Sequence, residues 1–180
     1  MARIHPTAVV DPGAKLADDV ELGPYTVVGD GVELGPGVVV GSHVIVVGRT
    51  KVGARTRIFP FSVIGEEPQV QGVEGETFLQ IGCDNIIREY ASIHAGSPIG
   101  VGSTRIGDGN FILNNVHVAH DCQIGSNCVI ASFSAMAGQS SRTTPCSGRW
   151  SESTSSCASG SRPSPARAAS SPRTWRPTPR

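Results

Sequence analysis

The sequence predicts an all-β protein folded as a parallel β-helix, on the basis of three observations. Aliphatic residues recur at every sixth position, small or β-branched residues follow each of them four positions later, and glycine often comes directly after the aliphatic residue. Neither the 3.6-residue period of an α-helix nor the alternation of an ordinary strand produces a strict period of six. A coil with three short flat sides does produce it, because each side points one large residue inward and bends at a small one.

The first run of repeats covers residues 4–64, and eighteen residues, or three repeats, are expected to make one coil. Its inward positions are all aliphatic: Ile4, Val10, Leu16, Leu22, Val28, Leu34, Val40, Val46, Val52, Ile58 and Ile64.

The pattern then breaks, resumes at Ile81, Ile87, Ile93 and Ile99, slips by one residue, and runs on through Ile106, Ile112, Val118, Ile124, Ile130 and Met136. The interruptions at roughly 66–80 and 97–105 are expected to be loops outside the coil, where insertions in such folds often carry binding.

The formal net charge of zero divides into two parts. Residues 1–139 carry 8 Lys and Arg against 14 Asp and Glu, whereas residues 140–180 carry 7 Arg against the single Glu152. The excess of acidic residues in 1–139 gives no reason to expect nucleic-acid binding, which needs clustered cations. The sequence shows no apolar run long enough for a membrane span and no secretory leader, so a cytoplasmic protein is expected.

Residues 140–180 follow different rules from residues 1–139. They contain 12 Ser and 6 Pro but no Val, Ile, Leu or Met, so they have nothing to bury in a continued coil and are expected to be a disordered tail. Two origins remain open, a natural tail and a reading frame shifted near codon 139. In the second case one shifted frame of residues 146–160 can encode restored aliphatic and glycine spacing.

The segment "NNVHVAHDCQIG", residues 114–125, holds the candidate chemistry. With Val118 and Cys122 pointing inward, His120 and Asp121 are expected on the outward corner and outside the core. A histidine beside a carboxylate can be held in one tautomer and serve as a general base. One coil onward from 120 lies Gly138, whose N–H is expected to stabilise an oxyanion above that base.

The six-residue repeat, or hexad, resembles that of the hexapeptide-repeat transferases. This resemblance implies a left-handed β-helix and a homotrimer. Three segments are similar to one family among them: "IHPTAVVDPGAKLADDVELGPYTVVG", "GETFLQIGCDNIIREYASIHAG" and "GDGNFILNNVHVAHDCQIGSNCVIASFSAMAG". This is the family of O-acyltransferases that move a 3-hydroxyacyl group from acyl carrier protein to UDP-N-acetylglucosamine in the first step of lipid A synthesis. The similarity covers about 139 of 180 residues.

The resemblance assigns roles to particular residues. It implies His120 as the catalytic base, Asp121 as its orienting acid and Gly138 as the oxyanion-hole donor, with His117 and His94 as accessory histidines that contact substrate. It implies neither a metal nor a bound cofactor.

Two stretches depart from the family. Where it carries an acid and a lysine, this chain has the run 68–72, "PQVQG", in which Gln69 is the expected substrate contact. Where it reads "HRGT", this chain has 94–97, "HAGS", and lacks the arginine.

Other functions stay open from the sequence. A related hexapeptide transferase could acylate an amine or use acetyl-CoA, although "AHD" favours the O-acyl class over the "AHN" of the amine-acylating relative. A zinc site like that of β-helical carbonic anhydrases needs three histidines, of which His117 and His120 supply two. Because the hexad stops near residue 139, the 180-residue chain is expected to be poorly active or inactive and to trimerise weakly.

Overall fold

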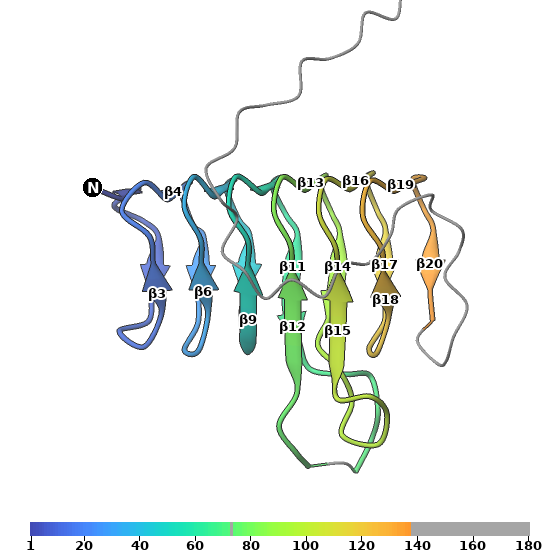
Figure 1. Cartoon of the computed structure of the whole chain (residues 1–180). Coiled ribbons are helices and arrows are strands. Elements are labelled where there is room, and N and C mark those ends of the chain that lie inside the picture. Colours follow the sequence, from blue (N-terminus) through green and yellow to red (C-terminus); the bar gives the residue numbers. More distant parts are fainter. Residues whose placement is uncertain (73, 138–180) are drawn as a thin grey trace, which may run out of the picture.

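The structure, a computed structural model, describes residues 1–72 and 74–137, and these residues form a left-handed parallel β-helix. Short strands follow one another around three sides of each coil, and successive coils stack into three parallel sheets (Figure 1). This confirms the fold class predicted from the six-residue repeat.

The three sheets contain the following strands. The first, sheet A, has β1 (Arg3–Ile4), β4 (Glu21–Leu22), β7 (Val39–Val40), β10 (Arg57–Ile58), β13 (Ile86–Ile87), β16 (Phe111–Ile112) and β19 (Val129–Ile130). Sheet B has β2 (Val9–Val10), β5 (Val27–Val28), β8 (Ile45–Val46), β11 (Val63–Glu66), β14 (Ser92–His94), β17 (His117–Val118) and β20 (Ala135–Met136). Sheet C has β3 (Lys15–Leu16), β6 (Glu33–Leu34), β9 (Arg49–Val52), β12 (Phe78–Ile81), β15 (Ser103–Ile106) and β18 (Gln123–Ile124).

The predicted inward residues form one continuous core. From Leu22 to Ile130 every aliphatic residue of the hexad except Ile99 is buried, and each stacks on its counterpart one coil away. In the first coil Ile4 is exposed, while Val10 and Leu16 are only partly buried, because within the described residues only the second coil packs against them. The hexad therefore identifies the side chains that hold the coils together by excluding water.

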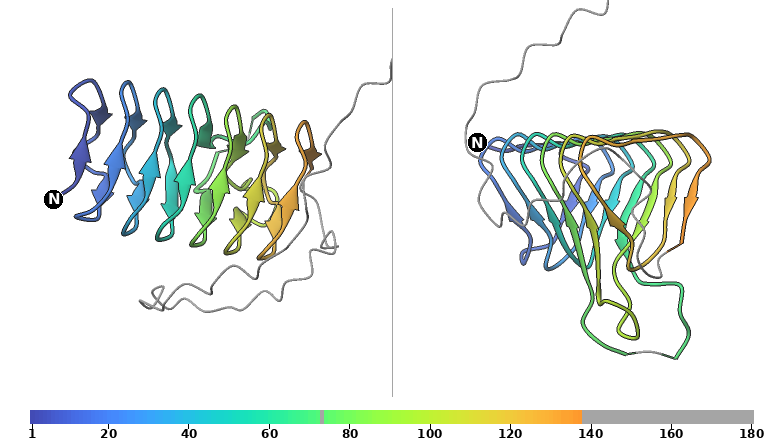
Figure 2. Two further views of the ribbon diagram at one scale, coloured as in Figure 1. Left: turned by 90° about the horizontal axis from the view of Figure 1, so that it is seen from above. Right: turned by 45° about the vertical axis from the view of Figure 1, so that its right-hand side comes forward.

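Two loops leave the coil between sheet B and sheet C, on consecutive coils. They lie between β11 and β12 and between β14 and β15, and they project side by side (Figure 2). A Cβ added to Gly75 of the first loop would lie 2.8 Å from Pro98 of the second, so the two loops are in contact. The prediction of two external loops is confirmed. The prediction for Ile99 is wrong, since this residue lies 65% exposed in the second loop and not in the core.

The corners of the coils need left-handed backbone conformations. At the corner between sheets A and B this position is taken by Tyr25, His43, Phe61 and Tyr90, all with φ between 55° and 62°. Their rings stack as a ladder along the helix axis, with centroids 5.0 to 5.3 Å apart. Ring stacking between coils can offset part of the cost of positive φ in residues other than glycine.

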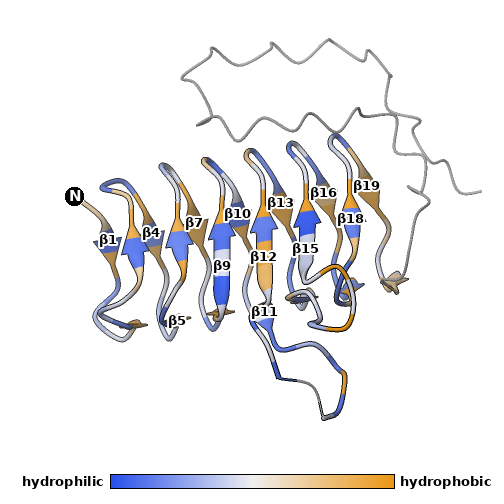
Figure 3. Ribbon diagram, turned by 60° about the horizontal axis from the view of Figure 1, so that its bottom comes forward, coloured by the Kyte–Doolittle hydropathy of each residue, from blue (hydrophilic) through white to orange (hydrophobic). Residues whose placement is uncertain are grey.

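The outward faces of the sheets differ in chemistry. On sheet C an ion-pair ladder joins Lys15 and Lys51 to Glu33, at 3.0 and 3.4 Å, and hydrophilic residues make up much of β9 and β15 (Figure 3). Sheet B instead presents Val9, Val27 and Ile45 to the exterior over its first three strands. The apolar outward stripe thus lies on the sheet that carries the histidines of the later coils.

Among the residues that the structure describes, no helix is long and apolar enough to cross a membrane. The boundary expected at residue 139, the tail at 140–180 and the position of Gly138 lie outside the described residues.

Candidate active site

His120 and Asp121 form the corner that leads from β17 into β18. Asp121 adopts a left-handed conformation with φ of 61°, which aspartate tolerates better than most residues. Its Oδ2 lies 2.8 Å from Nδ1 of His120. With the carboxylate accepting the Nδ1–H, the neutral imidazole keeps a lone pair on Nε2, as a general base requires.

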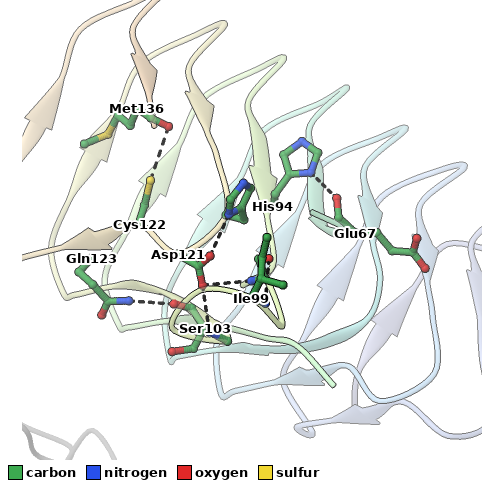
Figure 4. Close-up of polar contacts among 11 residues, drawn as sticks. Glu67, His94, Ile99, Ser103, Asp121, Cys122, Gln123 and Met136 are labelled. Atoms are coloured by element: carbon green, nitrogen blue, oxygen red, sulfur yellow. Dashed lines mark hydrogen bonds and ion pairs between the residues drawn. The ribbon is translucent and has the colours of Figure 1, made fainter. Parts of the chain in front are cut away.

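Asp121 is buried, contrary to the expectation that neither member of this pair belongs to the core. Its side chain is only 2% exposed, whereas that of His120 is 22% exposed. The second loop covers the carboxylate, because the backbone N–H groups of Ser97 and Gly102 both donate to Oδ1 at 3.0 Å (Figure 4). One oxygen of Asp121 therefore fixes the loop while the other holds the histidine.

The loop fits closely over Asp121 at Gly100. A Cβ at this position would overlap the carboxylate and lie 2.6 Å from its Cγ. Only a residue without a side chain can lie there while the bond between His120 and Asp121 keeps its length.

His94 and His117 lie together on sheet B, one coil apart, and Ser92 connects them. The Ser92 hydroxyl is 3.2 Å from Nε2 of His94 and 3.3 Å from Nδ1 of His117. Nδ1 of His94 donates at 2.7 Å to the carbonyl oxygen of Glu67 (Figure 4). The two imidazole rings meet edge to face with their centroids 5.2 Å apart.

The pKa of His117 is lowered, first because burial disfavours its charged form and second because His94 lies close by. His117 thus stays neutral to lower pH than an ordinary histidine.

Gln69 lies exposed in the loop between β11 and β12, two residues after Glu67. None of the hydrogen bonds described for residues 1–72 and 74–137 involves its side chain, so the structure does not bring Gln69 into the histidine cluster. Gly138 is outside the described residues. The register that points to it, His117 opposite Ala135 and Val118 opposite Met136, is an 18-residue step.

Cys122 is a free thiol directly after Asp121, buried in the core. Burial, followed by the neighbouring charge of Asp121, raises its pKa to about 11. A thiol that stays protonated at neutral pH is a poor nucleophile, so the chemistry of this corner is that of the imidazole.

No group of three or more His, Cys, Asp or Glu side chains within the described stretches could hold a metal ion. A hollow of about 520 Å³ lies over sheet C beside Arg49, Lys51 and Phe78. It does not include the histidines.

Sequence reasoning missed Ser92 and the loop amides of Ser97 and Gly102. Ser92 precedes His94 by two residues in a strand and therefore faces the same side, which is a signal the sequence does contain. The contact with His117 could not be counted in hexads, because 25 residues separate Ser92 from its partner where a regular coil has 18.

The sequence profile described as bacterial transferase hexapeptide (six repeats) matches residues 103–138. An acyl-(acyl-carrier-protein)–UDP-N-acetylglucosamine O-acyltransferase of Thiobacillus denitrificans is 51% identical over 139 residues, which are 77% of this chain and 54% of that protein. The protein of the same name from Halorhodospira halophila is 50% identical over 139 residues, again 77% and 54%.

Solved structures give the same result. A crystal structure of a UDP-N-acetylglucosamine acyltransferase superposes with a TM-score of 0.72 at 45% identity, over 74% of this chain and 52% of that one. The LpxA structure from Acinetobacter baumannii gives a TM-score of 0.68 at 42% identity, over 70% and 49%.

The coiled fold, its hexads and the histidine–aspartate corner define a β-helix of the hexapeptide-repeat transferase class. The chain spans about half the length of the curated relatives it matches. Within that class, the matched part of the chain is similar to the acyl-(acyl-carrier-protein)–UDP-N-acetylglucosamine O-acyltransferases.

Proposed function

We propose that the His120 corner transfers a 3-hydroxyacyl group from acyl carrier protein to the 3-hydroxyl of UDP-N-acetylglucosamine, the first step of lipid A synthesis. Nε2 of His120 takes the hydroxyl proton as the oxygen attacks the thioester carbonyl. The tetrahedral intermediate then collapses, the C–S bond breaks, and the proton passes to the departing thiolate of the carrier. The reaction needs no metal and no bound cofactor.

One observation carries the proposal: the bond between Nδ1 of His120 and Oδ2 of Asp121, 2.8 Å long, which leaves Nε2 as the basic nitrogen. In this proposal the N–H of Gly138 stabilises the oxyanion, supported by the 18-residue register that continues to Met136. His94, His117 and Gln69 contact the nucleotide sugar, and the first two are supported by their shared place on sheet B.

The test uses the purified 180-residue chain with 3-hydroxyacyl carrier protein and UDP-N-acetylglucosamine. Turnover is expected to be slow relative to a full-length relative, and His120→Ala should lower it by roughly 10²- to 10⁴-fold, the usual contribution of a general base. His43→Ala, a histidine in the corner ladder, is the control and should leave the rate unchanged.

Binding of UDP-N-acetylglucosamine, followed by NMR, provides a second readout if turnover is too slow to resolve. A wild-type chain that neither transfers nor binds would overturn the proposal. Preferential acylation of the 3-amino analogue would assign the site to amide formation instead.

The proposal also includes a homotrimer and a cytoplasmic location. The apolar outward stripe of sheet B, Val9, Val27 and Ile45, supports self-association, because such side chains gain free energy when a second copy covers them. Sedimentation velocity tests the assembly, and cell fractionation of the tagged chain tests the location.

A further inference from the structure

Ser92 lies between the two sheet B histidines. The proton positions in this series of hydrogen bonds follow from the backbone carbonyl of Glu67 at one end of it. A backbone carbonyl only accepts hydrogen bonds, so the 2.7 Å contact with Glu67 requires a proton on Nδ1 of His94. A neutral imidazole carries one proton, which leaves Nε2 of His94 as an acceptor. The hydroxyl facing it at 3.2 Å must therefore donate, and that hydroxyl belongs to Ser92.

The same reasoning extends to His117. Because the Ser92 hydroxyl donates its only proton to His94, its oxygen can only accept a hydrogen bond from Nδ1 of His117, 3.3 Å away. His117 thus carries its proton on Nδ1 and a lone pair on Nε2. Among the hydrogen bonds described for residues 1–72 and 74–137, none engages that Nε2.

The neutral state of His117 is favoured by its surroundings. Its ring meets that of His94 at 5.2 Å. Two imidazolium ions at this separation would repel each other. The pKa of His117 is lowered, first by its own burial and second by the closeness of His94.

We infer that Ser92 is a positioning residue that fixes the tautomers of both histidines, so that His117 offers Nε2 as an acceptor to a neutral donor of the bound molecule. The inference rests on the proposed function, in which that molecule is the nucleotide sugar. The matching donor is then a sugar hydroxyl or the N-acetyl N–H. A phosphate is excluded as the partner, because it would require a proton on Nε2.

The test measures tautomers directly, by long-range ¹H–¹⁵N correlation of the histidine rings in the purified full chain. The wild type should show His94 and His117 both protonated on Nδ1. In Ser92→Ala, His117 should shift toward the Nε2–H form, while His94 keeps its proton because the carbonyl of Glu67 is still present. Ser92→Thr, which retains the hydroxyl, should restore the wild-type pattern.

Val63→Ala is the matched control, since Val63 occupies the same outward position one coil earlier and lies outside the hydrogen-bonded chain. Its histidine tautomers should match those of the wild type. In Ser92→Ala the dissociation constant for UDP-N-acetylglucosamine should rise roughly 2- to 12-fold, the range for one hydrogen bond.

Wild-type His117 protonated on Nε2, or an unchanged tautomer in Ser92→Ala, overturns the inference. The two proposals fail separately. Correct tautomers in a chain that neither transfers the acyl group nor binds UDP-N-acetylglucosamine refute the function alone, and acyl transfer with a tautomer independent of Ser92 refutes only the role of Ser92.

Discussion

Asp121 uses both of its carboxylate oxygens, and this gives one residue two separable tasks. Oδ2 holds the ring of His120 in one tautomer, and Oδ1 accepts the amides of Ser97 and Gly102. An asparagine of the same shape can keep the second task but not the first.

We therefore expect Asp121→Asn to retain the hydrogen bonds to the loop but to remove the basic nitrogen of His120. The amide oxygen can still accept from the loop, but the NH₂ group must donate to Nδ1 of His120, which moves the ring proton to Nε2. The transfer rate should fall roughly 10²- to 10⁴-fold. Hydrogen exchange at Ser97 and Gly102 should stay as slow as in the wild type.

Asp84→Asn is the control for this substitution, because Asp84 also occupies a left-handed corner, with φ of 58°, but pairs on the surface with Arg55. It should leave the rate intact. Equal losses in the two variants would show that the corner, and not the histidine pair, is sensitive to the charge.

At the scale of elements, the second loop covers the corner formed by His120 and Asp121. Its Gly100 leaves room for the carboxylate of Asp121, and its neighbour Gly102 supplies one of the amides. Loop shape and base orientation are thereby coupled through one side chain.

Gly100→Ala should disturb both the loop conformation and the orientation of His120. The new Cβ would displace the carboxylate, so acyl transfer should slow roughly 10-fold or more, and exchange at the Ser97 and Gly102 amides should accelerate. Gly72→Ala is the matched change in the other loop, where a Cβ meets nothing within 4 Å although φ is +71°. A rate that falls equally in both variants would point to general loop strain.

The strands themselves distinguish inward from outward side chains at adjacent positions. Ile87 is fully buried, whereas Ile86 beside it is 37% exposed. Ile87→Ala should cost about 2–5 kcal/mol of unfolding free energy and Ile86→Ala about 1 kcal/mol or less. Urea unfolding followed by circular dichroism measures both, and similar midpoints would refute the assignment of the inward position.

The sequence predicted the strands far better than the loop that covers the candidate active site. A hexad residue such as Ile58 reports its own burial, because each coil repeats the same geometry. Asp121 and Ile99 were misplaced because their environment is set by a loop without any period. Ser92 was missed for the same reason, since its contact with His117 crosses that insertion and cannot be counted in steps of six.

At the scale of the whole molecule, the three sheets present different surfaces to a partner. Sheet C carries ion pairs between lysine and glutamate side chains on its outward face. The first strands of sheet B instead expose Val9, Val27 and Ile45. If the proposed trimer forms through sheet B, charge placed there should dissociate it.

Ile45→Lys should weaken self-association, raising the dissociation constant of the assembly by roughly tenfold or more, because an unpaired ammonium would be buried in the contact. Val129→Lys places the same charge on the outward face of sheet A, where Val129 is 70% exposed, and should have little effect. Sedimentation velocity over a concentration series distinguishes the two. An assembly that resists Ile45→Lys must use another face.

The spacing between stacked strands of sheet A has a consequence for engineering. Arg57 pairs with Ile86 across 29 residues and Ile86 with Phe111 across 25, yet the stack continues as it does where the step is 18. The stacked strands of sheet A thus stay in register although extra residues are inserted at the corner between sheets B and C. Ligand recognition could therefore be redesigned by grafting foreign segments at that corner, with the strands on either side unchanged.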